Sequence, residues 1–170
     1  LGTMVTPVTF RPPAVLANAV ATADHISGGR VELGLGSGWM EREHQAFGFP
    51  FPRPRVRQQM LAEQLEIVHR LWTEERVTFN GSHYTLENAP GRPRPLQSPH
   101  PPLIVGGRGT PGTTLPAARF ADEYNVSWDS HPQEFPDARQ RVIEACAEVG
   151  RDPATMRFSI AIHCIVGATR

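Results

Sequence analysis

Hydrophobic residues along this chain follow two alternating patterns: short apolar runs and longer stretches with helical spacing. After the prolines at 12 and 13, apolar residues recur at helical spacing at Val15, Leu16, Ala19, Val20, Ala23 and Ile26. The same spacing marks the segment 58–72, at Met60, Leu61, Leu65, Val68, Leu71 and Trp72. Shorter stretches of this kind cover about 113–121 and 136–150. The pattern therefore predicts four helices.

Apolar runs that are too short for helices predict five strands, at 1–6, 31–36, 103–106, 124–127 and 159–166. Each of the first four leads into a predicted helix, so we expect neighbouring parallel strands. Such alternation is typical of a doubly wound sheet or of a (β/α)8 barrel. In both folds the functional residues lie at the carboxyl ends of the strands. The predicted strand ends are the segments 4–6, 36–39, 106–109 and 125–128.

One segment interrupts this alternation. Two β-rich runs flank Asn80-Gly81, which predicts a hairpin over about 76–87 with a tight turn at that dipeptide. The loop before the second long helix, 49–57, is rich in proline and arginine, which is typical of an exposed connection.

Composition and charge narrow the range of partners. Seventeen basic and seventeen acidic residues give a formal net charge of zero, which offers no global support for binding nucleic acid or an anionic membrane. Small molecules are the expected partners. The cysteines, Cys146 and Cys164, lack the spacing of a zinc site or a disulfide scaffold and suit a reducing cytoplasm. His83 and His163 have no partners at metal-ligand spacing, so we expect no metal site.

Two glycine-rich stretches lie at predicted strand ends. Gly34, Gly36 and Gly38 are followed by Trp39, and this pattern matches neither a dinucleotide-binding fingerprint nor a Walker A loop. A second stretch, 106–109, precedes a predicted helix. Its backbone amides and the helix N-terminus would favour an anion, although glycines at these positions are equally explained by tight turns. Both interpretations stay open on spacing alone.

Three ordered motifs carry a resemblance to a known family: "LGTMVTPVTFRPPAVLANAVATADHISGGRVELGLGSGWMEREHQAFGFPF", "LEIVHRLWTEERVTFNGSHYTLENA" and "PPLIVGGRGTPGTTLPAARFADEYNV". They resemble the bacterial-luciferase-like superfamily, in particular its coenzyme F420-dependent oxidoreductases. The resemblance implies a (β/α)8 barrel that binds a flavin or 5-deazaflavin at its carboxyl end and commonly forms homodimers. Residues 1–170 would be a partial barrel domain with about five of the eight strands, beginning at the third and ending near the seventh.

The resemblance also assigns roles to individual residues. A strand bulge with a cis peptide between Met4 and Val5 would support one face of the cofactor ring. Gly36, Ser37 and Gly38 would approach the ring or its ribityl chain. The phosphate end would meet the second glycine stretch: Gly106, Gly107 and Gly109.

Catalytic residues are not identifiable, because relatives place many of them on strands that we expect to lie outside these 170 residues. Trp39 follows a strand end, where it faces the substrate or covers the loop. Glu43 and His44 are candidates for an acid–base pair, but neighbours on a helical turn point about 100° apart, which favours a role in fixing the loop.

The expected function is hydride transfer between F420 and a small organic substrate. One alternative is an FMN-dependent monooxygenase of the same superfamily. Another is a non-catalytic, truncated remnant that binds a partner chain.

Overall fold

The computed structural model describes residues 1–126, 132–162 and 166–167, and in this part of the chain five parallel strands form one sheet. The order across the sheet is β1-β2-β5-β6-β7, and each neighbouring pair is parallel. The strands are β1 (Thr6–Pro7), β2 (Leu33–Gly36), β5 (Leu103–Gly107), β6 (Glu123–Val126) and β7 (Arg157–Ile160). The sheet is open in the described residues, with β1 and β7 at its edges.

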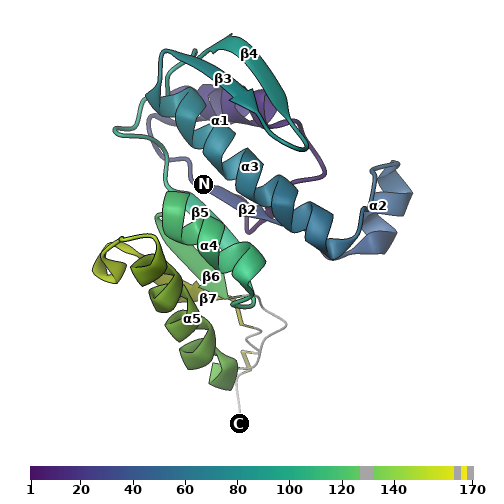
Figure 1. The fold of residues 1–170 in the computed structure, drawn as a ribbon, viewed down its shortest axis with the longest axis vertical. Coiled ribbons are helices and arrows are strands. Elements are labelled where there is room, and N and C mark those ends of the chain that lie inside the picture. Colours follow the sequence, from purple (N-terminus) through teal and green to yellow (C-terminus); the bar gives the residue numbers. More distant parts are fainter. Residues whose placement is uncertain (127–131, 163–165, 168–170) are drawn as a thin grey trace.

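Four helices pack side by side in chain order along the sheet (Figure 1). They are α1 (Pro13–Ser27), α3 (Pro54–Thr73), α4 (Pro111–Phe120) and α5 (Phe135–Glu148). Each has a proline in its first turn, where the missing N–H removes no intrahelical hydrogen bond. The short helix α2 (Glu41–Phe47) stands out from the body beside the start of α3 (Figure 1). Single 3-10 turns cover η1 (Pro132–Glu134) and η2 (Pro153–Thr155).

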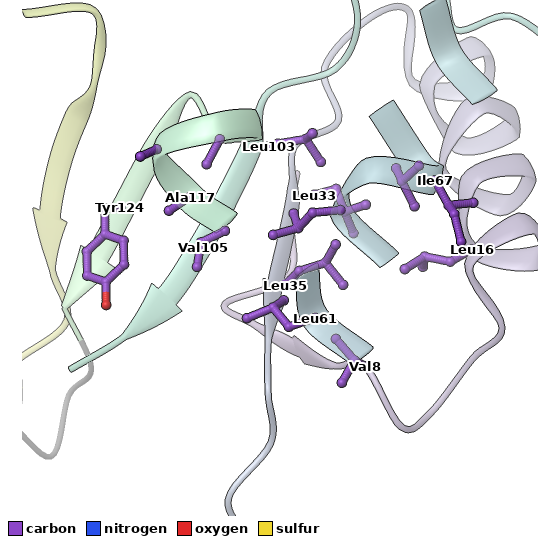
Figure 2. Packing of buried hydrophobic residues seen from close by; sticks show 14 of the residues in the cluster. Val8, Leu16, Leu33, Leu35, Leu61, Ile67, Leu103, Val105, Ala117 and Tyr124 are labelled. Carbon is purple, nitrogen blue, oxygen red and sulfur yellow. The ribbon is translucent and has the colours of Figure 1, made fainter. Parts of the chain in front are cut away.

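The hydrophobic core lies between the sheet and the helices, as Figure 2 shows. Alternate strand residues point to this side because side chains along a strand alternate between its faces. The sheet contributes Leu33, Leu35, Leu103, Val105 and Tyr124, and the helices contribute Leu16, Leu61, Leu65, Val68 and Ala117. The strand residues that alternate with these, among them Gly34, Gly36 and Gly106, therefore face the opposite side of the sheet.

A separate antiparallel hairpin of β3 (Arg76–Asn80) and β4 (Thr85–Pro90) packs against α3. The Glu63 carboxylate of α3 accepts hydrogen bonds from three successive amides at the hairpin tip, those of Ser82 (2.7 Å), His83 (3.0 Å) and Tyr84 (3.0 Å). A hairpin is present, but the predicted tight turn at Asn80-Gly81 is wrong, because Asn80 pairs with Thr85 as part of β3. Four residues connect the strands, because the tip curls around this carboxylate. Burial, with the Glu63 charge, raises the pKa of Tyr84 to about 12.

The parallel arrangement of all five predicted strands is confirmed, but two of them differ in extent. The first pairs as a strand only at Thr6–Pro7, with an isolated bridge between Gly2 and Glu32, because residues 3–5 leave the ladder in a bulge. The last runs over Arg157–Ile160 instead of 159–166, since its register places Arg157 beside Glu123. Ser127 and residues 163–165, also predicted as strand, lie outside the described residues.

The predicted helices are all present, with shifted ends. Helix α3 begins at Pro54, inside the segment that was expected to be loop, and α2 is an addition to the expected elements. No helix in the described ranges is both long enough and apolar enough to cross a membrane.

Candidate active site

A cavity of about 690 Å³ opens at the carboxyl ends of β1, β2, β5 and β6. Parallel strands end at the same edge of a sheet, so the loops that follow them enclose a common space. The cavity wall combines residues from these loops with the first residues of α3 and α4. Its lining includes Met4, Val5, Phe10, Arg11, Gly36, Ser37, Gly38, Trp39, Met40, Glu43, Gln58, Gly106, Gly107, Arg108, Thr110, Thr113 and Asn125.

The bulge at Val5 forms the floor of the cavity, and glycines on two strands make room for it. The Met4–Val5 peptide is cis, as the family resemblance predicted. A Cβ atom on Gly36 would lie 2.7 Å from Val5 Cγ2, and one on Gly106 would lie 2.9 Å from the same atom. Neither distance leaves space for a side chain. These two glycines are therefore required first by the packing of Val5, and only their backbones line the cavity.

Thr3 holds the bulge to the neighbouring strand. Its hydroxyl donates to the Gly34 carbonyl (2.8 Å) and accepts from the Gly34 N–H (3.1 Å). Residues 3–5 therefore stay attached to β2 although they are outside the strand ladder.

Tyr124 supports the loop after β5 from below. The Gly109 N–H donates to Tyr124 Oη (2.8 Å), and Thr113 Oγ1 lies at 2.8 Å from the same oxygen. A Cβ atom on Gly107 would lie 2.7 Å from Thr113 Oγ1, so this glycine is also required by internal packing. Gly109, with φ of +75°, adopts the left-handed conformation that favours glycine and does not line the cavity. Burial raises the pKa of Tyr124, which suits a neutral, hydrogen-bonded phenol.

The structure gives His44 a role in the loop after β2. His44 is fully buried on α2 between the rings of Phe10 (centroids 5.2 Å apart) and Phe51 (4.6 Å). Its Nδ1 lies 2.8 Å from the Met40 carbonyl, and its Nε2 lies 2.6 Å from the Thr9 hydroxyl. Because a carbonyl only accepts, Nδ1 carries the proton, and in the neutral ring Nε2 accepts from Thr9.

Glu43 and His44 point in different directions, so they do not form an acid–base pair in this structure. Glu43 lines the cavity and His44 does not. Trp39 also lines the cavity, with 63% of its surface exposed, at the mouth rather than on the floor. Gly38 turns the chain immediately before Trp39, with φ of +79°.

Arg57 of α3 fixes the same loop from the other side. Its Nε donates to the Ser37 carbonyl (3.1 Å), another of its nitrogens donates to the Pro52 carbonyl, and its guanidinium lies over the Phe51 ring at 3.9 Å. Burial lowers the pKa of Arg57. Sequence reasoning missed this residue, since it treated 49–57 as an exposed loop.

Other cavity residues were also missed, notably Phe10, Arg11, Gln58, Thr110 and Thr113. They come from loop and helix starts, where apolar periodicity gives no signal. Asn125 and the glycines, in contrast, lie in the strand-end segments that the sequence singled out. In the residues that the structure describes, no three His, Cys, Asp or Glu side chains gather as metal ligands would.

Comparisons with known proteins agree with this architecture. A family model for luciferase-like monooxygenases matches residues 1–170. An F420-dependent glucose-6-phosphate dehydrogenase from Kineococcus radiotolerans is 42% identical over 73% of this chain and 36% of its own length. An FMNH(2)-dependent dimethylsulfone monooxygenase from Pseudomonas putida is 31% identical over 69% of this chain and 32% of its own.

Among solved structures, an F420-dependent secondary alcohol dehydrogenase in complex with an F420–acetone adduct superposes with a TM-score of 0.81 and 28% identity. The match covers 94% of this chain and 48% of the other. The chain thus spans from about a third to about half of the length of these proteins. The expected luciferase-like α/β fold class is confirmed, and the five described strands form an open part of it.

Proposed function

Because this chain belongs to the luciferase-like monooxygenase family, we propose that its cavity binds coenzyme F420 and takes part in hydride transfer with a small organic substrate. F420 is preferred over FMN because the F420-dependent relative is 42% identical and the FMN-dependent one 31%. When bound, such a cofactor supplies the redox chemistry, and the protein supplies orientation and exclusion of water.

The single observation that carries this proposal is the Val5 bulge at the cavity floor. Gly36 of β2 and Gly106 of β5 lie against it, so neither of these strands places a side chain over Val5 at these positions. A flat ring can therefore lie against the bulge on one face and expose the other face to a substrate. The cavity volume of about 690 Å³ is in the range of cofactor and ligand pockets.

The loop after β5 fits the phosphate end of either cofactor. Residues 107–110 lead into the N-terminus of α4, a helix of ten residues, where backbone amides favour negative charge. Arg108 lines the cavity in the same loop and adds a positive charge. Its Nη2 also forms an ion pair with Glu134 Oε2 at 3.6 Å. This end of the cavity would hold the phosphate by backbone and charge together.

Part of the cavity wall is apolar. Its wall includes Phe10 and the exposed side chains of Trp39 and Met40, and a substrate that packs against these apolar groups would exclude water from the ring. Glu43 and Gln58 are polar groups in the same wall that can orient a substrate. The homodimer expected from the family stays a prediction for the whole protein.

Titration of the purified protein with F420 and, separately, with FMN tests the proposal through quenching of cofactor fluorescence. We expect saturable quenching by the protein, tighter for F420. Arg108→Gln is expected to weaken F420 binding at least about tenfold, since a charge-assisted contact contributes about 1.5–3 kcal/mol. Arg92→Gln, at an exposed arginine outside the cavity, is the matched control. Tighter binding of FMN would favour the monooxygenase alternative, and no quenching by either would favour the non-catalytic remnant.

A further inference from the structure

A row of contacting polar side chains crosses β6 and β7 on the face that points away from the helices, and it ends at the cavity. Arg157 and Ser159 of β7 pair in register with Glu123 and Asn125 of β6. Because residues two apart on a strand share a face, all four point to the same side of the sheet. Asn125 is the member that lines the cavity, with only 5% of its surface exposed.

Each hydrogen bond along this row of side chains can have only one donor. Arg157 Nε lies 3.5 Å from Glu123 Oε2, and Ser159 Oγ is hydrogen bonded to Glu123 Oε1. A carboxylate only accepts, so the single hydroxyl proton of Ser159 goes to Glu123. Ser159 Oγ can then only accept from Asn125, which lies 2.8 Å away through Nδ2. The amide of Asn125 is therefore held with its N–H₂ group toward Ser159.

This fixed orientation leaves the other end of the amide, Oδ1, for the cavity. Within the described part of the chain, Nδ2 is the side-chain atom of Asn125 that has a hydrogen-bond partner in the protein. We infer that Asn125 Oδ1 accepts a hydrogen bond from the imide N–H of the cofactor ring, and that Glu123 and Ser159 are positioning residues that set this polarity. The inference rests on the proposed function, because it concerns the same cavity.

Two features favour the ring over other donors. Asn125 pairs in register with Gly106, the glycine whose missing side chain makes room for Val5, so the amide is one strand away from the cavity floor. Neighbouring strands lie about 4.8 Å apart, and a three-ring system placed against Val5 extends beyond that spacing. The deazaflavin of F420 and the isoalloxazine of FMN both carry an imide N–H between two carbonyls, so the inference holds for either cofactor.

Methylation of the imide nitrogen gives a direct test. The protein is titrated with the cofactor that it binds, F420 or FMN, and with the N-methylimide derivative of the same compound. We expect methylation to weaken binding to the wild type roughly fivefold, as loss of one hydrogen bond does. In Asn125→Ala the unmethylated ring should bind more weakly, and the methyl penalty should disappear.

Further variants separate the acceptor from general packing. Asn125→Asp keeps an oxygen toward the cavity and should retain the methyl penalty. Glu123→Gln places an N–H₂ group that can donate to Ser159, so the direction of these hydrogen bonds is lost and the penalty should shrink with Asn125 still present. Asn18→Ala, at an exposed asparagine of α1, should leave the penalty unchanged. A purely structural role for these residues would weaken both ring forms equally.

The same penalty in Asn125→Ala and the wild type would overturn the inference while leaving the proposed function intact. The same methyl penalty in Glu123→Gln and the wild type would overturn the positioning role of Glu123. If Asn125→Ala does not fold, Glu123→Gln is the variant that decides, because an unchanged penalty there overturns the inference. No binding of either ring by the wild type would overturn the inference together with the proposed function.

Discussion

Val5 Cγ2 occupies the space that a side chain on Gly36 would need, 2.7 Å from the position of its Cβ. The bulge and the glycine are thus two halves of one packing arrangement across β1 and β2. This contact explains why an apolar run at 31–36 contains glycines at alternate positions, all facing the bulge.

Gly36→Ala is expected to destabilise the protein by about 1–3 kcal/mol, because the added methyl group overpacks the site. Val5→Ala removes the obstructing methyl groups, so in the double variant the alanine at position 36 should cost much less than it does alone. Urea denaturation of the four proteins measures the coupling. Additive effects of the two substitutions would contradict the packing arrangement.

His44 is expected to matter for stability rather than for proton transfer. Thr9→Val removes the partner of His44 Nε2 in a buried site and should cost about 1–3 kcal/mol of unfolding free energy. His44→Ala should cost more, since it also leaves a cavity between Phe10 and Phe51. Thermal melting measures both, with His83→Ala at the half-buried hairpin tip, away from this contact, as a control. An unchanged melting temperature in both variants, at positions 9 and 44, would restore His44 as a catalytic candidate.

Asp24 makes the stability of the protein depend on pH in the acid range. Its buried carboxylate accepts from the Leu96 N–H (2.8 Å), the Gln97 N–H (2.9 Å) and Gln97 Nε2 (2.7 Å), which ties α1 to the segment before β5. Burial works against its charge, but these hydrogen bonds outweigh burial, and the pKa of Asp24 is lowered. The stabilisation is therefore fully present above the unfolded pKa of about 3.9 and is lost as pH falls through the folded value.

Asp24→Asn should lose about 1–3 kcal/mol of stability at neutral pH, because an amide N–H₂ group then faces N–H donors. The difference from the wild type should stay constant between about pH 7 and pH 5 and shrink below about pH 4. Denaturant titrations at a series of pH values measure this. A difference that grows on acidification would show the opposite sign of linkage.

Glu63 is expected to hold the hairpin tip to α3. In Glu63→Gln one carboxylate oxygen becomes an N–H₂ group that faces backbone donors, so the three tip amides lose part of their hydrogen bonding. Hydrogen exchange at Ser82, His83 and Tyr84 should accelerate at least tenfold. Exchange in β5, which this carboxylate does not contact, should be unchanged. Equal acceleration in both places would indicate global destabilisation instead.

The sequence predicts the larger elements because their signals are local. The apolar spacing around Leu61, Leu65 and Val68 is that of a helix with one buried face, and the structure has this helix. Helix α2 has a single buried residue, His44, and therefore no apolar periodicity to detect. Its position depends on contacts of His44 with Thr9 and Phe10, which are distant in the sequence, and with Phe51 of the following loop.

The candidate site is predictable in location but not in the role of its glycines. Strand ends mark the cavity correctly, since Gly36, Gly106 and Asn125 all line it. Spacing alone left open whether a glycine makes room for a ligand or for another part of the protein. That distinction depends on side chains from other strands, such as Val5 beneath Gly106 and Tyr124 beneath the next loop.

The support of the cavity loop by Tyr124 has a consequence for how these sequences diverge. A side chain at position 107 would need the space of the Thr113 and Tyr124 hydroxyls, and removal of the phenol oxygen would leave the Gly109 N–H without its acceptor. Substitutions at positions 107, 113 and 124 should therefore covary among related sequences. At Gly150 an added Cβ would meet no atom within 4 Å, and the residue is restricted by its own φ of +74° instead, so substitutions there should not covary with this set.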